Sequence, residues 1–184
     1  MEKMQPPKFT GNVRDFARFK SEYDAIVKPS YDNPVHQMHV LKNRCLQDEA
    51  LELVKNLSDL DAIWDRLTDK YGNTVDIVDS VIQDIQKCTI PKNNRDRGFV
   101  EFVGVLEKGF QDLKAINKEA EVASAYTVRI IEGKIPQRIH LNWLEYLENE
   151  TTIMSSGYDK FMSLIEFLKK ERRRVERVLS AKPA

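Results

Sequence analysis

Residues 99–113 have the sequence Phe99-Val100-Glu101-Phe102-Val103-Gly104-Val105-Leu106-Glu107-Lys108-Gly109-Phe110-Gln111-Asp112-Leu113. The large apolar side chains of this segment recur every three or four positions, which is the repeat of one helix face. The segment therefore predicts a long amphipathic helix with one buried side. Gly104 and Gly109 lie inside this helix, where each costs about 1 kcal/mol relative to alanine. We expect another backbone to approach closely at both glycines.

The same helical spacing continues through the rest of the chain, between turn and capping signals. Asn12, the pair Asn33-Pro34, and Ser58 are placed to begin three further helices. No segment shows the alternation of a half-buried strand, and no repeat period is visible. The sequence predicts an all-α fold of about nine helices in two small lobes, residues 1–73 with an extended N-terminal arm and residues 74–184.

Charge and cysteine content limit the classes of function. The 29 basic and 29 acidic residues give a formal net charge of zero, so no global basic field attracts nucleic acid. A neutral chain also has little protection against self-association. Two cysteines, Cys45 and Cys88, do not make a disulfide framework. Without a signal segment or an apolar run of about 20 residues, we expect a cytoplasmic protein with no membrane partner.

Residue patterns for catalysis are scarce. The phosphate-binding, dinucleotide-binding, metalloprotease and serine-hydrolase motifs do not occur. His36 and His39 share nearly one helix face, with Cys45 two turns further on, but a zinc site needs at least one more ligand. Histidines on a helix surface are the simpler interpretation, and a cysteine nucleophile paired with a histidine stays open. We expect no enzymatic activity, no metal and no cofactor.

One segment near the C-terminus is locally basic. Its candidate RNA-facing residues are Lys169, Lys170, Arg172, Arg173, Arg174 and Arg177. Such a patch would attract phosphates. The alternative is a solvated last part of a helix, where cations suit the negative end of the helix dipole. Aromatic residues are not interleaved with the basic ones, so we expect no base stacking there.

A second candidate surface lies in the predicted helix after Pro136. Trp143, Tyr146 and Leu147 give this helix more apolar surface than a single face needs. These three residues are candidates for a contact between copies of the chain. The alternative is that they cap the core of the second lobe.

Several landmarks occur in a fixed order along the chain. They are Pro7-Lys8-Phe9-Thr10-Gly11 followed by Phe16 and Phe19, Ala62-Ile63-Trp64 followed by Leu67 and Tyr71-Gly72, Glu107-Lys108-Gly109-Phe110-Gln111-Asp112-Leu113, Ile131-Glu132-Gly133-Lys134-Ile135-Pro136, and the segment 161–173. In this order they resemble the capsid region of retroelement Gag proteins of the Pao/Bel retrotransposon branch, which is related to gypsy-type and Arc capsid folds. The resemblance covers about residues 7–177. Phe16 stands where that family usually has tryptophan, and no cysteine–histidine knuckle is present.

The resemblance implies that the two lobes are the N- and C-terminal domains of a structural Gag capsid protein. Such a protein self-assembles into virus-like particles that package RNA, through capsomer contacts of the first lobe and a two-fold contact of the second. Flanking Gag regions are then expected to bind the RNA. The alternative is a monomeric domesticated adaptor that binds peptides in a groove of the first lobe, formed by Phe9, Thr10, Gly11, Phe16 and Phe19. In that case an extended peptide would add as a strand beside the arm, unless the arm simply packs on its own lobe.

Overall fold

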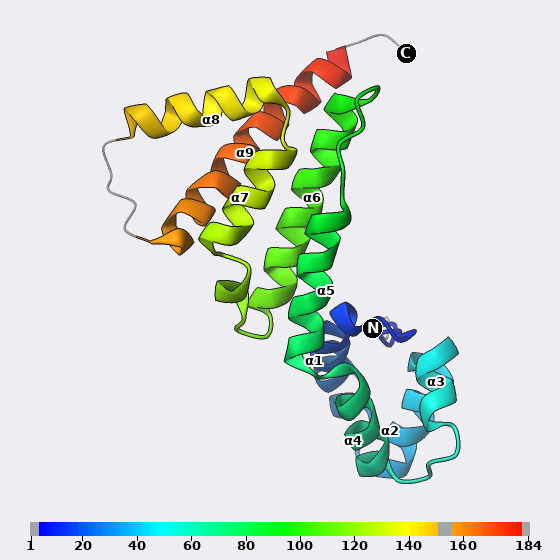
Figure 1. Cartoon of the computed structure of the whole chain (residues 1–184). Helices are drawn as coiled ribbons and strands as arrows, with labels where there is room; N and C mark the ends of the chain where they lie inside the picture. The colour runs from blue at the N-terminus through cyan, green and yellow to red at the C-terminus, as the bar shows by residue number, and fades with distance from the viewer. Residues whose placement is uncertain (1–3, 151–155, 182–184) are drawn as a thin grey trace. The chain divides into compact units, whose positions relative to one another are not determined.

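The computed structural model describes residues 4–150 and 156–181 of the 184-residue chain (Figure 1). These residues form nine α-helices, no β-strand and one isolated β-bridge, which confirms the predicted all-α fold. The chain divides into two compact units, Met1–Ile77 and Val78–Ala184. The division falls inside helix α5 (Thr74–Lys87), a few residues after the predicted boundary between residues 73 and 74. That these units are capsid lobes stays a prediction.

The first unit contains four short α-helices that follow an extended arm. They are α1 (Phe16–Ile26), α2 (Pro34–Val40), α3 (Asp48–Val54) and α4 (Leu60–Tyr71). Single turns of 3₁₀-helix, η1 (Val13–Asp15) and η2 (Lys28–Ser30), flank α1, and the π-helical segment η3 (Leu41–Cys45) extends α2. Helices this short are marginal in isolation, so their stability depends on packing.

Side-chain caps begin η1, α2 and α4 of the first unit, whereas α1 and α3 begin without one. The backbone N–H of Arg14 donates to Asn12 Oδ1 at 3.0 Å, and that of Val35 donates to Asn33 Oδ1 at 2.8 Å. The prediction that Ser58 caps α4 is wrong. Asp59 occupies the cap position in an extended conformation, and its carboxylate accepts from the N–H of Ala62 at 3.1 Å. The carboxylate there also meets the positive end of the helix dipole.

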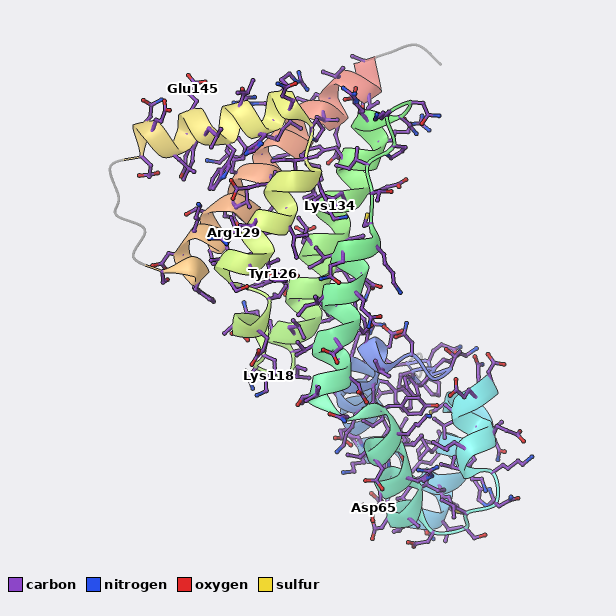
Figure 2. All side chains as sticks on the ribbon, viewed as in Figure 1. Asp65, Lys118, Tyr126, Arg129, Lys134 and Glu145 are labelled. Atoms are coloured by element: carbon purple, nitrogen blue, oxygen red, sulfur yellow. The ribbon has the colours of Figure 1, made fainter. Side chains whose placement is uncertain are left out.

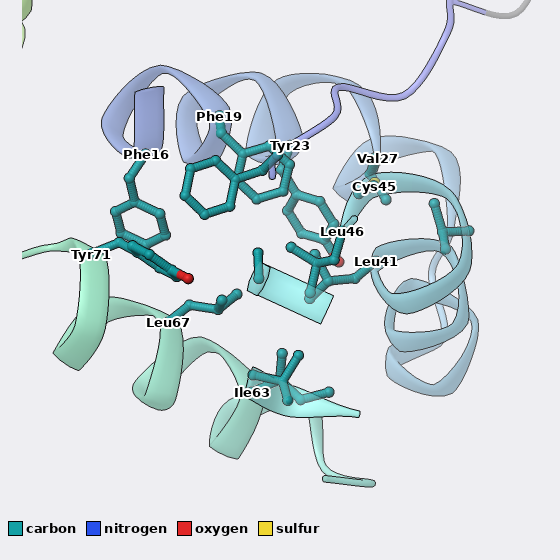
Figure 3. Packing of buried hydrophobic residues seen from close by; sticks show 14 residues of the cluster. Phe16, Phe19, Tyr23, Val27, Leu41, Cys45, Leu46, Ile63, Leu67 and Tyr71 are labelled. Carbon is teal, nitrogen blue, oxygen red and sulfur yellow. The ribbon is translucent and has the colours of Figure 1, made fainter. Parts of the chain in front are cut away.

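The core of the first unit lies where α1, α4 and η3 face one another (Figure 3). Phe16, Phe19 and Tyr23 project from one side of α1 toward Leu67 and Tyr71 on α4. Trp64 is only partly buried and packs at the margin of this core, with its ring centroid 4.8 Å from that of Tyr23. The helical spacing after Pro34 predicts that Val35, Leu41 and Cys45 face inward. Leu41 and Cys45 are buried as predicted, but Val35 is 54% exposed and Val40 is buried in its place.

The second unit is built around the long helix α9 (Gly157–Ala181). Helix α9 packs most extensively against α6 (Arg95–Lys114) and α7 (Ala125–Lys134), and more sparsely against α8 (Gln137–Asn149). The turn η4 (Glu119–Glu121) connects α6 to α7. The predicted stripe of α6 is confirmed, because the buried residues of this helix include Phe99, Phe102, Val103, Leu106, Phe110 and Leu113.

Three details of the second unit differ from the sequence-based predictions. A Cβ added at Gly104 would have nothing within 4 Å, so no backbone approaches this glycine, whereas a Cβ at Gly98 would lie 2.7 Å from Pro91 Cδ. Gly109 is buried. The apolar spacing after Ala120 predicts a helix over 120–133, but α7 begins only at Ala125, because Ser124 caps it by accepting from the N–H of Thr127 at 3.3 Å. In the last helix the apolar spacing from Phe161 onward predicts that Val178 faces inward, but this residue is 51% exposed.

Each unit uses one lysine to bind the carbonyl groups that follow a helix. Lys42 Nζ donates to the carbonyl oxygens of Lys55 and Leu57, at 2.9 and 2.7 Å, beyond the end of α3. Lys134 Nζ, on the last turn of α7 (Figure 2), donates to those of Gln86 and Cys88, at 2.7 and 2.8 Å, at the end of α5. Both lysines satisfy carbonyls that have no partner within a helix.

The arm is bound to the first unit through Phe9. The N–H of Phe9 donates to the carbonyl of Cys45, and its own carbonyl accepts from the N–H of Gln47, both at 2.9 Å. Its ring is 2% exposed and lies 5.1 Å from the ring of Phe19 and 5.0 Å from that of Tyr71, measured between centroids. A single side chain therefore joins the arm, α1 and α4.

We expect Phe9→Ala to destabilise the first unit by about 3–5 kcal/mol, because it removes a fully buried aromatic ring from a small core. The measurement is denaturant unfolding followed by tryptophan fluorescence, to which Trp64 contributes from the margin of that core. Lys8→Ala, at the exposed neighbouring position, is the matched control and should unfold as the parent chain does. Equal unfolding midpoints for Phe9→Ala and Lys8→Ala would show that the arm does not stabilise the unit.

Candidate functional site

The predicted peptide groove of the first unit is filled by the arm itself. Phe9, Phe16 and Phe19 are all buried, at 2%, 5% and 2% exposure. The backbone of Phe9 already forms a parallel bridge with Leu46, and the carbonyl of Thr10 accepts from the N–H of Ala50 at 3.2 Å. These hydrogen bonds are the ones an added peptide strand would need. The structure thus corrects the groove prediction in favour of its alternative, an arm that packs on its own unit.

Gly11 allows the arm to turn toward η1. Its φ of 125° lies in a region that residues with a side chain rarely adopt, and a Cβ there would lie 3.1 Å from the hydroxyl oxygen of Tyr71. Gly11 therefore has a backbone role. Burial raises the pKa of Tyr71, which keeps its phenol neutral beside the arm.

An open hollow of about 380 Å³ lies beside the beginning of the arm. Its lining is mostly apolar and includes Pro6, Val27, Tyr31 and Arg44. None of the five residues predicted for the peptide groove lines it. If the first unit binds a peptide, this hollow is the available place.

Trp143 is not an interface residue in the described structure. Its side chain is fully buried, with its ring centroid 5.3 Å from that of Phe167 on α9 and 5.6 Å from that of Tyr146. Tyr146 and Leu147 are half-buried. The prediction that these three residues form a contact between copies is corrected for Trp143, which belongs to the core of its own unit.

The exposed apolar side chains of α8 are not the predicted ones. Leu141 is 58% exposed and Leu144 is 41% exposed. They are three positions apart and therefore share one helix face. Among the large apolar side chains that are exposed in residues 4–150 and 156–181, only these two are such a pair on one helix. The sequence could have indicated an exposed apolar face, because Ile139 and Trp143 lie on one face of this helix and Leu141 and Leu144 lie on another.

The predicted basic patch separates into two groups on α9. Arg172 turns toward α6, where its two terminal nitrogens donate to the two carboxylate oxygens of Glu107 at 3.1 and 3.3 Å. Lys169 Nζ lies 3.6 Å from the same carboxylate. The other four residues, Lys170, Arg173, Arg174 and Arg177, are exposed. Two of the six cations therefore stabilise the packing of α6 on α9.

The side chains considered for catalysis or metal binding do not converge. His36 and His39 lie on α2, away from the core, whereas Cys45 is fully buried in η3. Burial raises the pKa of Cys45 to about 11 and also raises that of Cys88, so both thiols stay protonated at neutral pH, where a nucleophile would need the thiolate. Within the described ranges, no three His, Cys, Asp or Glu side chains gather as a metal site requires.

No helix within residues 4–150 and 156–181 has both the length and the apolar character needed to cross a lipid bilayer.

The structure defines an all-helical protein of two units. Residues 9–152 match the family described as Protein of unknown function (DUF1759). This range is more than half of the chain, and the chain belongs to that family. The family is one of proteins associated with retrotransposons and their Gag-Pol products, so the link to retroelements is supported, whereas the Pao/Bel branch stays a prediction. No curated protein and no solved structure matches the chain.

The pairing of Glu107 with Arg172 and Lys169 predicts that the stability of the second unit depends on pH. The hydrogen bond from Arg172 holds the pKa of Glu107 below its usual value. Because the folded-state pKa is lowered, the stabilisation is present above the unfolded pKa of about 4.3 and is lost as the pH falls through the folded value.

We expect Glu107→Gln to lower the free energy of unfolding by about 1 kcal/mol at pH 7, a value reduced by the partial exposure of the pair. The difference from the parent should shrink below a pH of about 4.3. The measurement is urea unfolding at a series of pH values. Glu101→Gln, at an exposed position of the same helix, is the control. A difference that stays constant down to acidic pH would exclude an ionised Glu107 as its source.

Proposed function

We propose that this protein is a structural Gag-type capsid protein of a retroelement, or of a gene derived from one, that self-assembles into shells around RNA. The observation that carries this proposal is the match of residues 9–152 to a retroelement-associated family. The finer assignment to the Pao/Bel branch is part of the proposal and rests on the order of the landmarks along the chain.

Two physical properties support assembly. A formal net charge of zero allows copies to approach without long-range repulsion. A shell also needs weak contacts that are repeated and that close on themselves. The division into two compact units supplies two separate bodies on which such contacts can form.

The exposed face of α8 is the contact that we assign to the second unit. Leu141 and Leu144 form an apolar pair flanked by charged residues such as Arg138 and Glu145, and Glu145 lies on the outer edge of α8 in Figure 2. In a two-fold arrangement, the pair on one copy would meet the same pair on another. This surface takes the place of the predicted Trp143 contact.

The alternative function, a monomeric adaptor that binds peptides, rests on the hollow beside Pro6 and Tyr31. Its lining is mostly apolar, with Arg44 as a charged residue at its side. An adaptor of this kind stays monomeric at high concentration. A self-assembling protein forms oligomers under the same conditions. The oligomeric state at high concentration therefore distinguishes the two functions.

We expect the parent chain, concentrated in phosphate buffer that favours burial of apolar surface, to form closed shells or tubes in electron micrographs. Leu141→Glu combined with Leu144→Glu should abolish them, because facing carboxylates repel one another at the contact. Tyr126→Glu, which places the same kind of charge at a residue of α7 that is 62% exposed, should assemble like the parent (Figure 2).

Thermal unfolding of all three proteins tests whether the substitutions leave the fold intact. Assembly of the Leu141→Glu, Leu144→Glu protein would exclude α8 as the contact. A parent chain that remains monomeric in sedimentation experiments at every salt concentration and with RNA would refute self-assembly and favour the adaptor.

A further inference from the structure

Four exposed cations of α9 form one continuous face of the helix. Lys170, Arg173, Arg174 and Arg177 follow one another at spacings of three, one and three positions. Residues three, four and seven positions apart lie on the same side of a helix. We call these four residues the basic face. With a rise of about 1.5 Å per residue, the basic face extends over about 10 Å of the helix.

Most of the charge on the basic face is not used by the fold. Lys170, Arg173 and Arg177 have no ion-pair partner in the described part of the chain. Arg174 donates from Nη1 to Glu171 at 3.1 Å, yet its side chain remains 75% exposed. Since a guanidinium has five N–H donors, Arg174 keeps most of them for another acceptor.

The basic face continues into a hollow between α8 and α9. This hollow measures about 510 Å³, and Lys170 and Arg174 line it together with the rings of Tyr146 and Phe167. The two ring centroids are 5.7 Å apart. We call this space the aromatic hollow. The fold therefore brings aromatic rings beside the cations, although the sequence predicts no base stacking there, because Tyr146 is distant along the chain.

The two rings are held in place from behind. The fully buried Trp143 lies against both, with centroid distances of 5.6 Å to Tyr146 and 5.3 Å to Phe167. A hydrogen bond with Glu150 orients the phenol of Tyr146 and raises its pKa. Both rings are half-buried, so each keeps part of its surface open to the hollow. Preorganised rings lose little entropy when a ligand stacks on them.

The two carboxylates that line the aromatic hollow each lie beside a cation, although Lys169 is shared with Glu107 and Arg174 belongs to the basic face. Glu171 is 5% exposed and accepts from Arg174, and Glu166 lies 3.2 Å from Lys169 Nζ. These pairs reduce the repulsion that an approaching anion would meet. Lys170 and the arginines at 173 and 177 then supply an uncompensated positive charge.

We infer that the basic face and the aromatic hollow together form a binding site for single-stranded nucleic acid. The cations contact backbone phosphates, and a base enters the hollow and stacks on Phe167 or Tyr146. Cations that follow a backbone, beside aromatic rings that accept any base, are the combination used for single strands. The paired bases inside a duplex are not free to stack on the rings, and the Asp and Glu side chains that give a peptide its negative charge have no planar ring. This inference deepens the proposed function, because it places RNA contact on the proposed capsid chain itself.

The test measures binding of a fluorescent single-stranded RNA of about 12 nucleotides, within the site sizes known for single-strand binders. The full chain is used at a concentration too low for assembly and at several salt concentrations. For single strands, each neutralised phosphate contributes about −0.7 to the slope of log K against log salt. Arg173→Gln combined with Arg177→Gln should therefore reduce this slope by about 1.4 and weaken binding several-fold at low salt.

The matched control is Lys114→Gln combined with Lys118→Gln. It removes the same charge from exposed positions near the end of α6 (Figure 2) and should leave the salt slope unchanged. Equal weakening by the two double variants would overturn the inference, because binding would then follow overall charge. An absence of binding to the parent chain at low salt would also overturn it.

Stacking is tested with a strand of the same length that has abasic positions, so that phosphates are kept and bases are removed. The parent should prefer the base-bearing strand, and Phe167→Leu should remove that preference while leaving the salt slope intact. Equal binding of both strands by the parent, or equal binding of a duplex or a sulfated polysaccharide, would overturn the inference. A single-stranded DNA of the same sequence shows whether the site prefers RNA to DNA, because tighter RNA binding indicates recognition of the 2′-hydroxyl.

RNA binding is also measured in the Leu141→Glu, Leu144→Glu protein, which is expected not to assemble. Binding is then observed apart from assembly, so this inference and the proposed function are tested separately. Specific binding without assembly of the parent chain would keep the site and refute the capsid proposal. Assembly of the parent chain without specific binding would keep the capsid proposal and refute the nucleic-acid site.

Discussion

The burial of Phe9 is the contact on which the first unit depends. The four helices of this unit are each between 7 and 12 residues long, which is too short for stability in isolation. The ring of Phe9 fills the space between α1 and α4, and its backbone hydrogen bonds with Cys45 and Gln47 hold the arm against η3. An element with no regular structure of its own thus completes the core. This also explains why the groove beside it is closed to an added strand.

The helices and the principal core residues could be predicted because they depend on local spacing and on caps. The stripe of α6 and the caps at Asn12 and Asn33 follow from residues that are near one another in the chain. Predictions failed where a choice between equivalent residues depended on distant parts. Val35 and Val40 have similar propensities, but only the packing of α2 decides that Val40 is the buried one. Likewise, Ser58 and Asp59 can both cap a helix, and α4 begins at Leu60, directly after Asp59, so that Asp59 is the cap.

The candidate surfaces were less predictable than the fold, because they depend on side chains from different helices. The six cations near the C-terminus have the same chemistry in the sequence, yet Glu107 on α6 binds two of them and leaves the other four outside. Trp143 is of a residue type that is common at interfaces, but Phe167 and Tyr146 pack against its ring and cover it. The aromatic hollow joins Tyr146 and Lys170, which no local pattern places together.

The positions of the residues on α8 bear on whether assembly and nucleic-acid binding can occur together. At about 100° per residue, Leu141 and Leu144 lie on the side of α8 opposite to Trp143 and Tyr146. The proposed contact between copies and the aromatic hollow therefore use opposite sides of one helix, so a strand bound in the hollow leaves the leucine pair free. The chain as a whole is neutral, and its basic face is a local excess of charge. Phosphates bound there would reduce repulsion between the basic faces of neighbouring copies, which makes the nucleic acid favour assembly without being part of the contact.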